Sequence, residues 1–357
     1  IHTFQACAFD HSATAPHFQT MGSADRREKP LSQAAIQWHR KIMKKILMIP
    51  AAVLAFSMSL SAKDQKQVSP SPDQIINESP KGDWVRIPSE DLLIMTIGLP
   101  KEETKRQVVI QLMPPPFSEG WTHNIRLLAR EGWYEGTSIN RVQDNYVVQW
   151  GDPNYDNPES EGQPKPLPPG LRVMEESEYV TPDVRDLSEE RLTKGIYAPA
   201  TGHYLGWPVG VNQSDVWPVH CYAMVGVGRN YSPDTGSGAE LYAVIGHAPR
   251  HLDRNIALVG RVISGIENLS SLPRGSGILG FYSSDEVPKR TLILSMQVAT
   301  DLPELEQPKF EYLDTESVAF ADYAEARANR RDPFFISPAG GADICNIPVP
   351  IRAIGAE

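Results

Sequence analysis

The chain has 357 residues, of which 41% are hydrophobic and 22% charged, and its formal net charge is −10 at neutral pH. This acidic balance excludes general electrostatic binding of nucleic acid, which depends on basic clusters that we do not find in the sequence. The 31 prolines outnumber the 26 glycines, and because proline breaks helix interiors, this composition argues against a helical bundle.

The N-terminal part has the features of an export signal. Met43 and two lysines precede an apolar run over residues 46–60, which ends in small residues. This order is typical of a secretory signal peptide, and the run is short for a membrane span. We therefore expect residues 43–62 to be a signal peptide that directs the chain to the periplasm. Residues 1–42 are expected to be a disordered upstream leader, and residues 63–83 a linker.

The first folded elements are predicted to be a β-hairpin and a helix. Leu92–Ile97 and Gln107–Leu112 are rich in β-branched and apolar residues and are separated by a polar turn. A helix follows, since Pro114–Pro116 precede an amphipathic stretch and Gly132 ends it.

Six further short strands are predicted downstream. They are Thr137–Val142, Tyr146–Trp150, Tyr222–Val227, Leu241–Ile245, Ala257–Ile263 and Thr291–Ala299. Eight short strands with turn residues between them and few helices predict an all-β barrel or sandwich. We expect this domain to span residues 84–300.

Two segments interrupt the pattern of strands. Residues 152–170 contain six prolines in 19 positions, and the irregular stretch continues to about Pro218. A loop of this length is more often functional or disordered than a simple connection, so we expect an insertion at about 153–218. Residues 301–357 form a C-terminal extension, in which Ser317–Arg331 is predicted to be a helix.

Two cysteines, Cys221 and Cys345, remain beyond the predicted signal peptide. An even pair in an exported protein is compatible with a disulfide, because the periplasm is oxidising. The alternative is two separately buried thiols, which are common in protein interiors. The histidines show no metal-ligand spacing, and no metal or organic cofactor is expected.

The stretch that follows the predicted helix carries the most informative motif. Its residues are Arg141, Tyr146, Val147, Gln149, Gly151 and Asp152. This pattern resembles the signature of the cyclophilins, in which a Phe-His-Arg triplet leads through a turn to Gly-Phe-Met-x-Gln-Gly-Gly-Asp. Four other segments agree with the family in order and spacing. They are the helix that contains Asn124, Ile125 and Leu128, then Tyr222–Gly228, Gly238–Tyr242, and Leu252-Asp253 followed by Val259–Gly265.

The resemblance covers roughly residues 92–299 and implies a cyclophilin-like closed eight-stranded β-barrel capped by helices. It also implies peptidyl-prolyl cis-trans isomerase activity on proline-containing polypeptides, here exported ones. Amide resonance opposes this isomerisation with a barrier of about 18–20 kcal/mol. No bond is broken, so the reaction needs an apolar pocket and a donor for the twisted amide rather than a nucleophile. In the family an arginine hydrogen-bonds the prolyl nitrogen, and the resemblance assigns this catalytic role to Arg141.

The resemblance also assigns the substrate-binding residues. They are Tyr146, Val147, Gln149, Val225, Glu240, Tyr242, His251 and Leu252. The chain departs from the family where Asn140 replaces a histidine and Glu240 replaces a glutamine. Because these changes alter one wall of the pocket, the alternative function is a non-catalytic cyclophilin-like peptide-binding chaperone or scaffold. In either case we expect a monomer that binds no nucleic acid and contacts no membrane beyond its signal peptide.

Overall fold

The computed structural model describes residues 69–99, 103–154, 162–182, 184, 187, 190 and 192–355. The predicted leader, the predicted signal peptide and the first residues of the predicted linker lie outside these residues. Among the described residues, no helix is long and apolar enough to cross a membrane.

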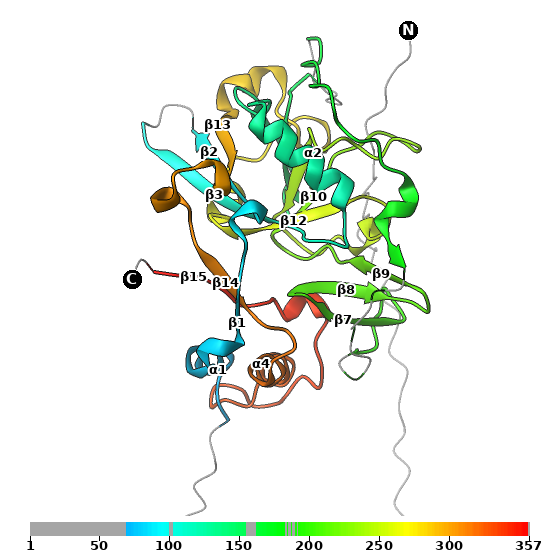
Figure 1. Ribbon diagram of the computed structural model, residues 1–357, viewed down its shortest axis with the longest axis vertical. Helices are drawn as coiled ribbons and strands as arrows, with labels where there is room; N and C mark the ends of the chain where they lie inside the picture. Colours follow the sequence, from blue (N-terminus) through cyan, green and yellow to red (C-terminus); the bar gives the residue numbers. More distant parts are fainter. Residues whose placement is uncertain are drawn as a thin grey trace, which may run out of the picture. The chain divides into compact units, whose positions relative to one another are not determined.

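Eight antiparallel strands of the described chain close into a barrel (Figure 1). They are β2 (Leu92–Gly98), β3 (Lys105–Leu112), β4 (Ser138–Val142), β5 (Val147–Gly151), β10 (Met224–Val227), β11 (Leu241–Val244), β12 (Leu258–Ser264) and β13 (Thr291–Val298). Their order around the barrel is β10-β11-β5-β4-β13-β2-β3-β12, and pairing of β12 with β10 closes the ring. These strands coincide with the eight predicted from the sequence, so the closed barrel is confirmed.

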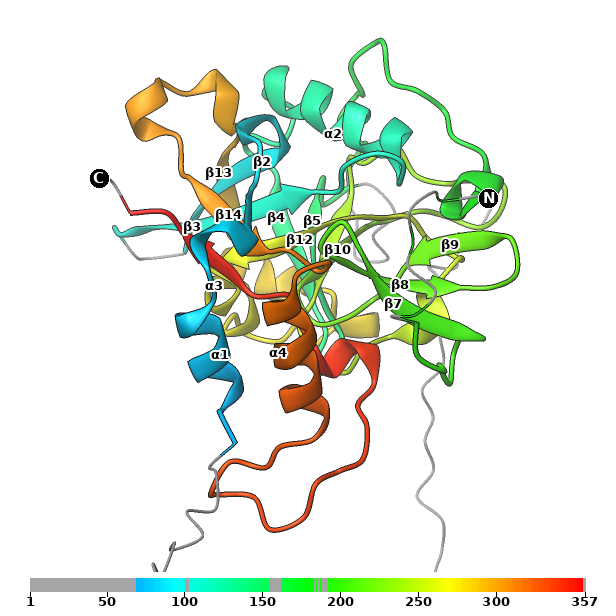
Figure 2. The ribbon, with the colours of Figure 1, turned by 60° about the horizontal axis from the view of Figure 1, so that its bottom comes forward.

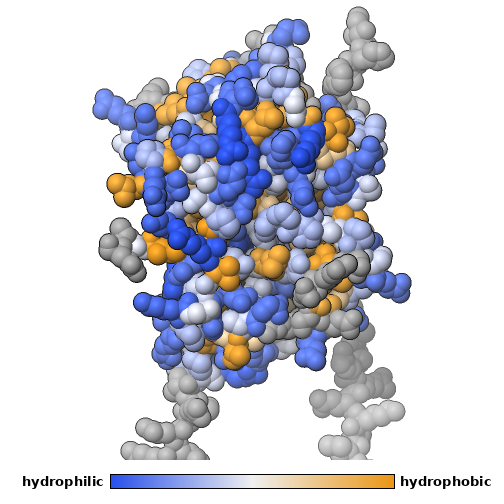
Figure 3. All heavy atoms as spheres, viewed as in Figure 1, coloured by the Kyte–Doolittle hydropathy of each residue, from blue (hydrophilic) through white to orange (hydrophobic). Residues whose placement is uncertain are grey.

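Helix α2 (Glu119–Arg130) packs against the apolar core of the barrel. Trp121, Ile125 and Leu128 lie on one face at helical spacing and are fully buried with the core residues of the strands. Each such side chain contributes about 1.5–3 kcal/mol by leaving water. Gly132 takes a positive φ of 63° just after the helix, the backbone conformation that favours glycine at this position. Polar side chains gather where α2 lies on the face shown in Figure 3.

The insertion contains a four-stranded sheet, which the sequence did not predict. Its strands, in spatial order, are β6 (Thr181–Pro182), β9 (Asp215–Pro218), β8 (Trp207–Val211) and β7 (Ala200–Tyr204). Pro208 lies inside β8 and Pro218 is the last residue of β9, although proline in a sequence normally argues against a strand. The turn between β7 and β8 is only Leu205-Gly206, both with positive φ, as tight hairpins require.

The C-terminal extension contributes two strands of a second small sheet and one α-helix. The sheet has the order β1 (Trp84–Arg86), β14 (Phe310–Leu313) and β15 (Ile351–Ala353). Helix α4 (Val318–Ala328) lies within the predicted helix, and it packs beside α1 (Pro72–Glu78) (Figures 1 and 2). Helix α1 lies within the predicted linker. The Ser71 side chain caps it by accepting a hydrogen bond from the backbone nitrogen of Gln74, and Pro72 is its first residue.

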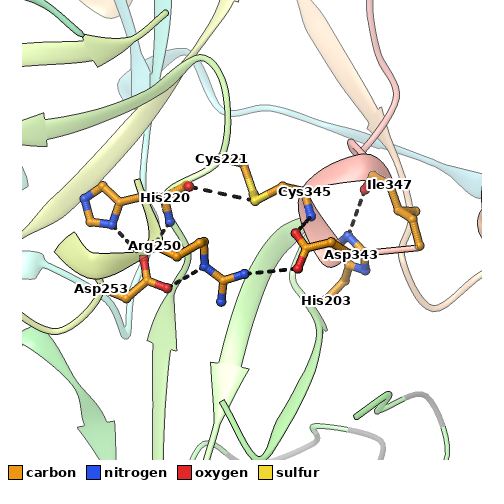
Figure 4. Close-up of a disulfide and its surroundings, with 8 residues drawn as sticks. All are labelled: His203, His220, Cys221, Arg250, Asp253, Asp343, Cys345 and Ile347. Carbon is orange, nitrogen blue, oxygen red and sulfur yellow. Dashed lines mark hydrogen bonds and ion pairs between the residues drawn. A yellow bond between two sulfur atoms is a disulfide. The ribbon is translucent and has the colours of Figure 1, made fainter. Parts of the chain in front are cut away.

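Shorter helical segments connect these elements. They are α3 (Glu267–Ser270) and 3₁₀ turns that include Arg250–Leu252, Ser284–Lys289 and Ile344–Asn346. Cys221 and Cys345 are joined in a disulfide with their Cα atoms 5.1 Å apart. This bond ties the last of these turns to the segment that precedes β10 (Figure 4).

Candidate functional site

Arg141 lies on β4 opposite Gln149 of β5, and its guanidinium is held by acceptors from three directions. Its Nε donates to the backbone carbonyl of Leu279 at 2.8 Å, and one terminal nitrogen donates to Gln149 Oε1 at 3.2 Å. The other terminal nitrogen donates to Gln143 Oε1. These bonds fix the plane of the guanidinium, whose rigid set of donors suits the recognition of a single amide geometry.

Two aromatic rings lie against the same guanidinium. Its central carbon is 5.7 Å from the ring centre of Tyr146 and 5.4 Å from that of Phe281. Tyr146 follows the turn between β4 and β5, while Phe281 is bridged to the backbone of Arg141. A cation over aromatic faces is attracted by the ring quadrupole, so this contact also stabilises the placement of Arg141.

Tyr146 also packs against an apolar cluster that is separate from the barrel interior. Its buried members are Val147, Tyr242, Val244 and Leu252, with Tyr146 and Ile256 packed against them. The structure thus brings together four of the predicted substrate-binding residues beside Arg141. We call this group the proline cluster, because an apolar surface next to a fixed donor is what a prolyl amide requires.

Val225 does not belong to the proline cluster. It is buried in the barrel interior, together with Val227 of the same strand. Successive residues of a strand face opposite sides, so the residue that faces the cluster is Gly226. A Cβ on Gly226 would lie 2.3 Å from Cζ of Tyr242, so the tyrosine ring packs directly on the glycine backbone.

Glu240 lies behind Gln149 and is almost completely buried. Its carboxyl group packs onto Gly151, where a Cβ would lie 2.1 Å from Glu240 Oε1. Burial raises the pKa of Glu240 well above its usual range, although the Asp152 backbone and the side-chain amides of Gln149 and Asn140 lower it in part. Because it is enclosed in this way, Glu240 supports the site from inside and does not present a surface to a peptide.

His251 lies at the rim of the proline cluster. Its ring is exposed and stacks on Tyr146, with centroids 6.2 Å apart and an interplanar angle of 10°. The two rings form one edge of the site, whereas the neighbouring Leu252 points into the cluster.

Three residues to which the sequence assigned no functional role form a buried hydrogen-bonded network beneath Tyr242. The Tyr242 hydroxyl lies 3.0 Å from His220 Nε2, and His220 Nδ1 lies 2.9 Å from Asp253 Oδ1. Arg250 Nε donates to the other Asp253 oxygen at 2.7 Å (Figure 4). Burial alone would raise the pKa of Asp253, but hydrogen bonds from His220 and the charge of Arg250 hold it below its usual value. Of these residues, only Asp253 lies in a segment that resembles the family, the pair Leu252-Asp253.

The arrangement can bind and polarise an amide, but it presents no activated nucleophile. The described residues contain no group of three or more histidine, cysteine, aspartate or glutamate side chains placed to hold a metal ion. Cys221 and Cys345 are consumed in the disulfide, so neither is available as a thiolate.

Comparisons with known proteins bear on the family and the fold of this chain. Residues 108–298 match the family model described as cyclophilin type peptidyl-prolyl cis-trans isomerase/CLD. The chain is also similar to the crystal structure of cyclophilin AquaCyp293 from Hirschia baltica, with a TM-score of 0.55 and 20% sequence identity. That match covers 77% of this chain and 94% of the other, and at this identity it concerns the fold alone. No curated protein matched the sequence.

Proposed function

The chain belongs to the cyclophilin family of peptidyl-prolyl cis-trans isomerases, and from this membership we propose that it catalyses prolyl isomerisation with Arg141 as the catalytic residue. Members of the family bind proline-containing peptides. The observation that carries the proposal is the placement of Arg141 at the edge of the proline cluster, between Tyr146 and Gln149.

The mechanism follows from what the transition state needs. As the X-Pro bond twists, the prolyl nitrogen loses its conjugation and becomes a hydrogen-bond acceptor. A hydrogen bond from Arg141 to this nitrogen is stronger in the twisted amide than in the planar one. Only an interaction that is stronger in the transition state than in the ground state accelerates the reaction. The bonds of Arg141 to Leu279 and Gln149 keep its plane fixed, so little reorganisation is needed during the twist.

The proline ring would rest on Tyr146, Val147, Tyr242 and Leu252, which supply its apolar contacts. Gln149 would bind the peptide backbone next to the proline, because its amide can both donate and accept. His251 extends the rim of the site and would contact the residues that flank the proline.

A second candidate is peptide binding without catalysis. Each of the three guanidinium nitrogens of Arg141 already donates to a protein acceptor. At least three of its five N–H groups are thus engaged within the protein, so fewer donors remain for the twisted amide. This observation favours the alternative that the chain holds proline segments as a chaperone or scaffold.

The experiment that separates the two functions measures rate and affinity on the same peptide. Exchange spectroscopy by NMR on an Ala-Pro peptide reports the cis–trans rate, and chemical-shift titration with the full chain reports Kd. Accelerated exchange supports the isomerase. Saturable binding with the uncatalysed rate, repeated for several residues before proline, supports the binding module and contradicts catalysis.

We further propose that the protein acts on exported polypeptides in the periplasm. The predicted signal peptide over residues 43–62 leads to this proposal, and the Cys221–Cys345 disulfide supports it because such bonds persist in oxidising compartments. Cell fractionation and N-terminal sequencing of the mature protein test it. A mature chain that starts close to residue 63 in the periplasmic fraction is expected, and an unprocessed cytoplasmic chain would refute export.

A further inference from the structure

A buried network of side-chain hydrogen bonds connects Tyr242 of the proline cluster to the interior of the protein. Its other members are His220, Asp253 and Arg250. The side chains of His220, Asp253 and Arg250 are 1%, 5% and 2% exposed. Because water does not compete at these positions, each bond restrains its partners more than a surface bond would.

The charge of Asp253 settles the direction of the hydrogen bonds that it makes. Asp253 is ionised, since its pKa is lowered, and it accepts from Arg250 and from both the ring Nδ1 and the backbone nitrogen of His220. With a proton on Nδ1, Nε2 is the ring nitrogen that faces the tyrosine. The Tyr242 hydroxyl bonds this nitrogen at 3.0 Å, which fixes the far end of the tyrosine ring.

The C-terminal extension contacts the opposite side of this hydrogen-bonded network. Cys221, the residue after His220, is joined to Cys345, whose sulfur lies 3.8 Å from the His220 carbonyl oxygen. Asp343 accepts from the Cys345 backbone nitrogen and lies 3.5 Å from a terminal nitrogen of Arg250 (Figure 4). The segment around Cys345 is thus linked to the hydrogen-bonded residues by the disulfide to Cys221 and by the ion pair between Asp343 and Arg250.

We propose that His220 is a positioning residue that holds Tyr242 in the proline cluster, and that the disulfide-linked C-terminal extension supports His220 in this role. This inference rests on the proposed function of the proline cluster. The family pattern that Gly238–Tyr242 resembles, Gly-Ser-Gln-Phe-Phe, ends in phenylalanine, so the Tyr242 hydroxyl and its buried acceptor distinguish this protein from that pattern. Gly226 fixes one face of the ring and His220 fixes its tip, which together set the depth to which a proline ring enters.

Removal of the single hydroxyl tests the positioning role. Tyr242→Phe keeps the ring and is expected to raise KM and Kd for the Ala-Pro peptide roughly fivefold, as the loss of one buried hydrogen bond implies. We expect kcat to change less, because ring contacts stabilise ground state and transition state alike. The matched control is Tyr323→Phe, which removes the hydroxyl of another buried tyrosine, one that donates to the Pro348 carbonyl at 2.7 Å in the extension. That control should leave KM unchanged.

Two substitutions of His220 separate positioning from folding. His220→Gln places an amide near Nε2 and retains a partner for Tyr242, whereas His220→Asn places one near Nδ1 and retains a partner for Asp253. Positioning predicts that the glutamine variant keeps a KM closer to the wild type. Equal KM values for both variants, or a Tyr242→Phe variant with wild-type KM and Kd, would overturn the inference.

The same measurements distinguish this inference from the proposed function. A wild-type chain that binds the peptide without accelerating exchange contradicts catalysis, and the Kd values of the variants still decide the role of His220. An active wild type with an unchanged Tyr242→Phe variant refutes the positioning role alone. A wild type that neither binds nor accelerates overturns both.

Discussion

Removal of the disulfide should cost a large part of the stability of the folded chain. Cys221 and Cys345 are 124 residues apart, so the bond closes a long loop in the unfolded chain. The chain-entropy relation for a loop of this length gives about 5 kcal/mol, and native disulfides typically contribute about 2–5 kcal/mol. The Cys221→Ser/Cys345→Ser double variant also places a hydroxyl where Cys221 is buried among apolar side chains, which adds to the loss.

The assay is urea-induced unfolding of the full chain, followed by the fluorescence of buried tryptophans such as Trp121 and Trp150. We expect the free energy of unfolding of the double variant to fall by about 2–5 kcal/mol relative to the oxidised wild type. Reduction of the wild type should reproduce most of this loss, which separates the covalent bond from the serine substitutions. A loss below about 1 kcal/mol, or alkylation of both cysteines in the unreduced folded protein, would refute the reasoning.

Three further substitutions test the surroundings of the site. Gly226→Ala places a Cβ 2.3 Å from Tyr242 Cζ, so we expect about 1–3 kcal/mol of destabilisation in urea and weaker Ala-Pro binding by NMR titration. Burial raises the pKa of Glu240, so the stability that its neutral form contributes is lost as pH rises. In urea unfolding, Glu240→Gln should therefore stabilise the protein more at about pH 7 than at about pH 4. The backbone of Ser276 is the main donor that lowers the pKa of Glu286 to about 2, so Glu286 stabilises the fold above its unfolded pKa. Glu286→Gln should therefore destabilise the protein at neutral pH, with a difference that vanishes as pH falls towards 2 in the same assay.

The barrel could be predicted because the signals that indicate its strands and its helix lie close together in the sequence. Runs of β-branched residues, glycine and proline turns and the helix signals around α2 all lie within short windows of the sequence. The motif that contains Arg141 and Gln149 is equally local, since the two residues pair across one turn. The same signals were present at Ser71-Pro72, which begins α1, but the polar surroundings there resembled a linker.

The parts that the sequence did not predict depend on faces and long-range contacts. Strand β10 is buried on both sides, so alternation of polarity does not reveal that Gly226 rather than Val225 faces the proline cluster. The bond between His220 and Tyr242 joins residues that are 22 positions apart. For Cys221 and Cys345, which are 124 positions apart, the sequence left a disulfide and two separate thiols as alternatives, and the structure shows the disulfide. Such pairs become visible only when the barrel and its extension are assembled.

The most direct test of the central claim is the isomerisation rate of Arg141→Ala beside the wild type, measured by exchange spectroscopy on the same Ala-Pro peptide. A charged hydrogen bond lost from the transition state predicts a roughly 10- to 100-fold fall in kcat/KM. Arg274→Ala is the matched control, because this exposed arginine binds Asp144 on the nearby turn and should leave the rate unchanged. An active wild type whose folded Arg141→Ala variant retains the full rate would contradict the account.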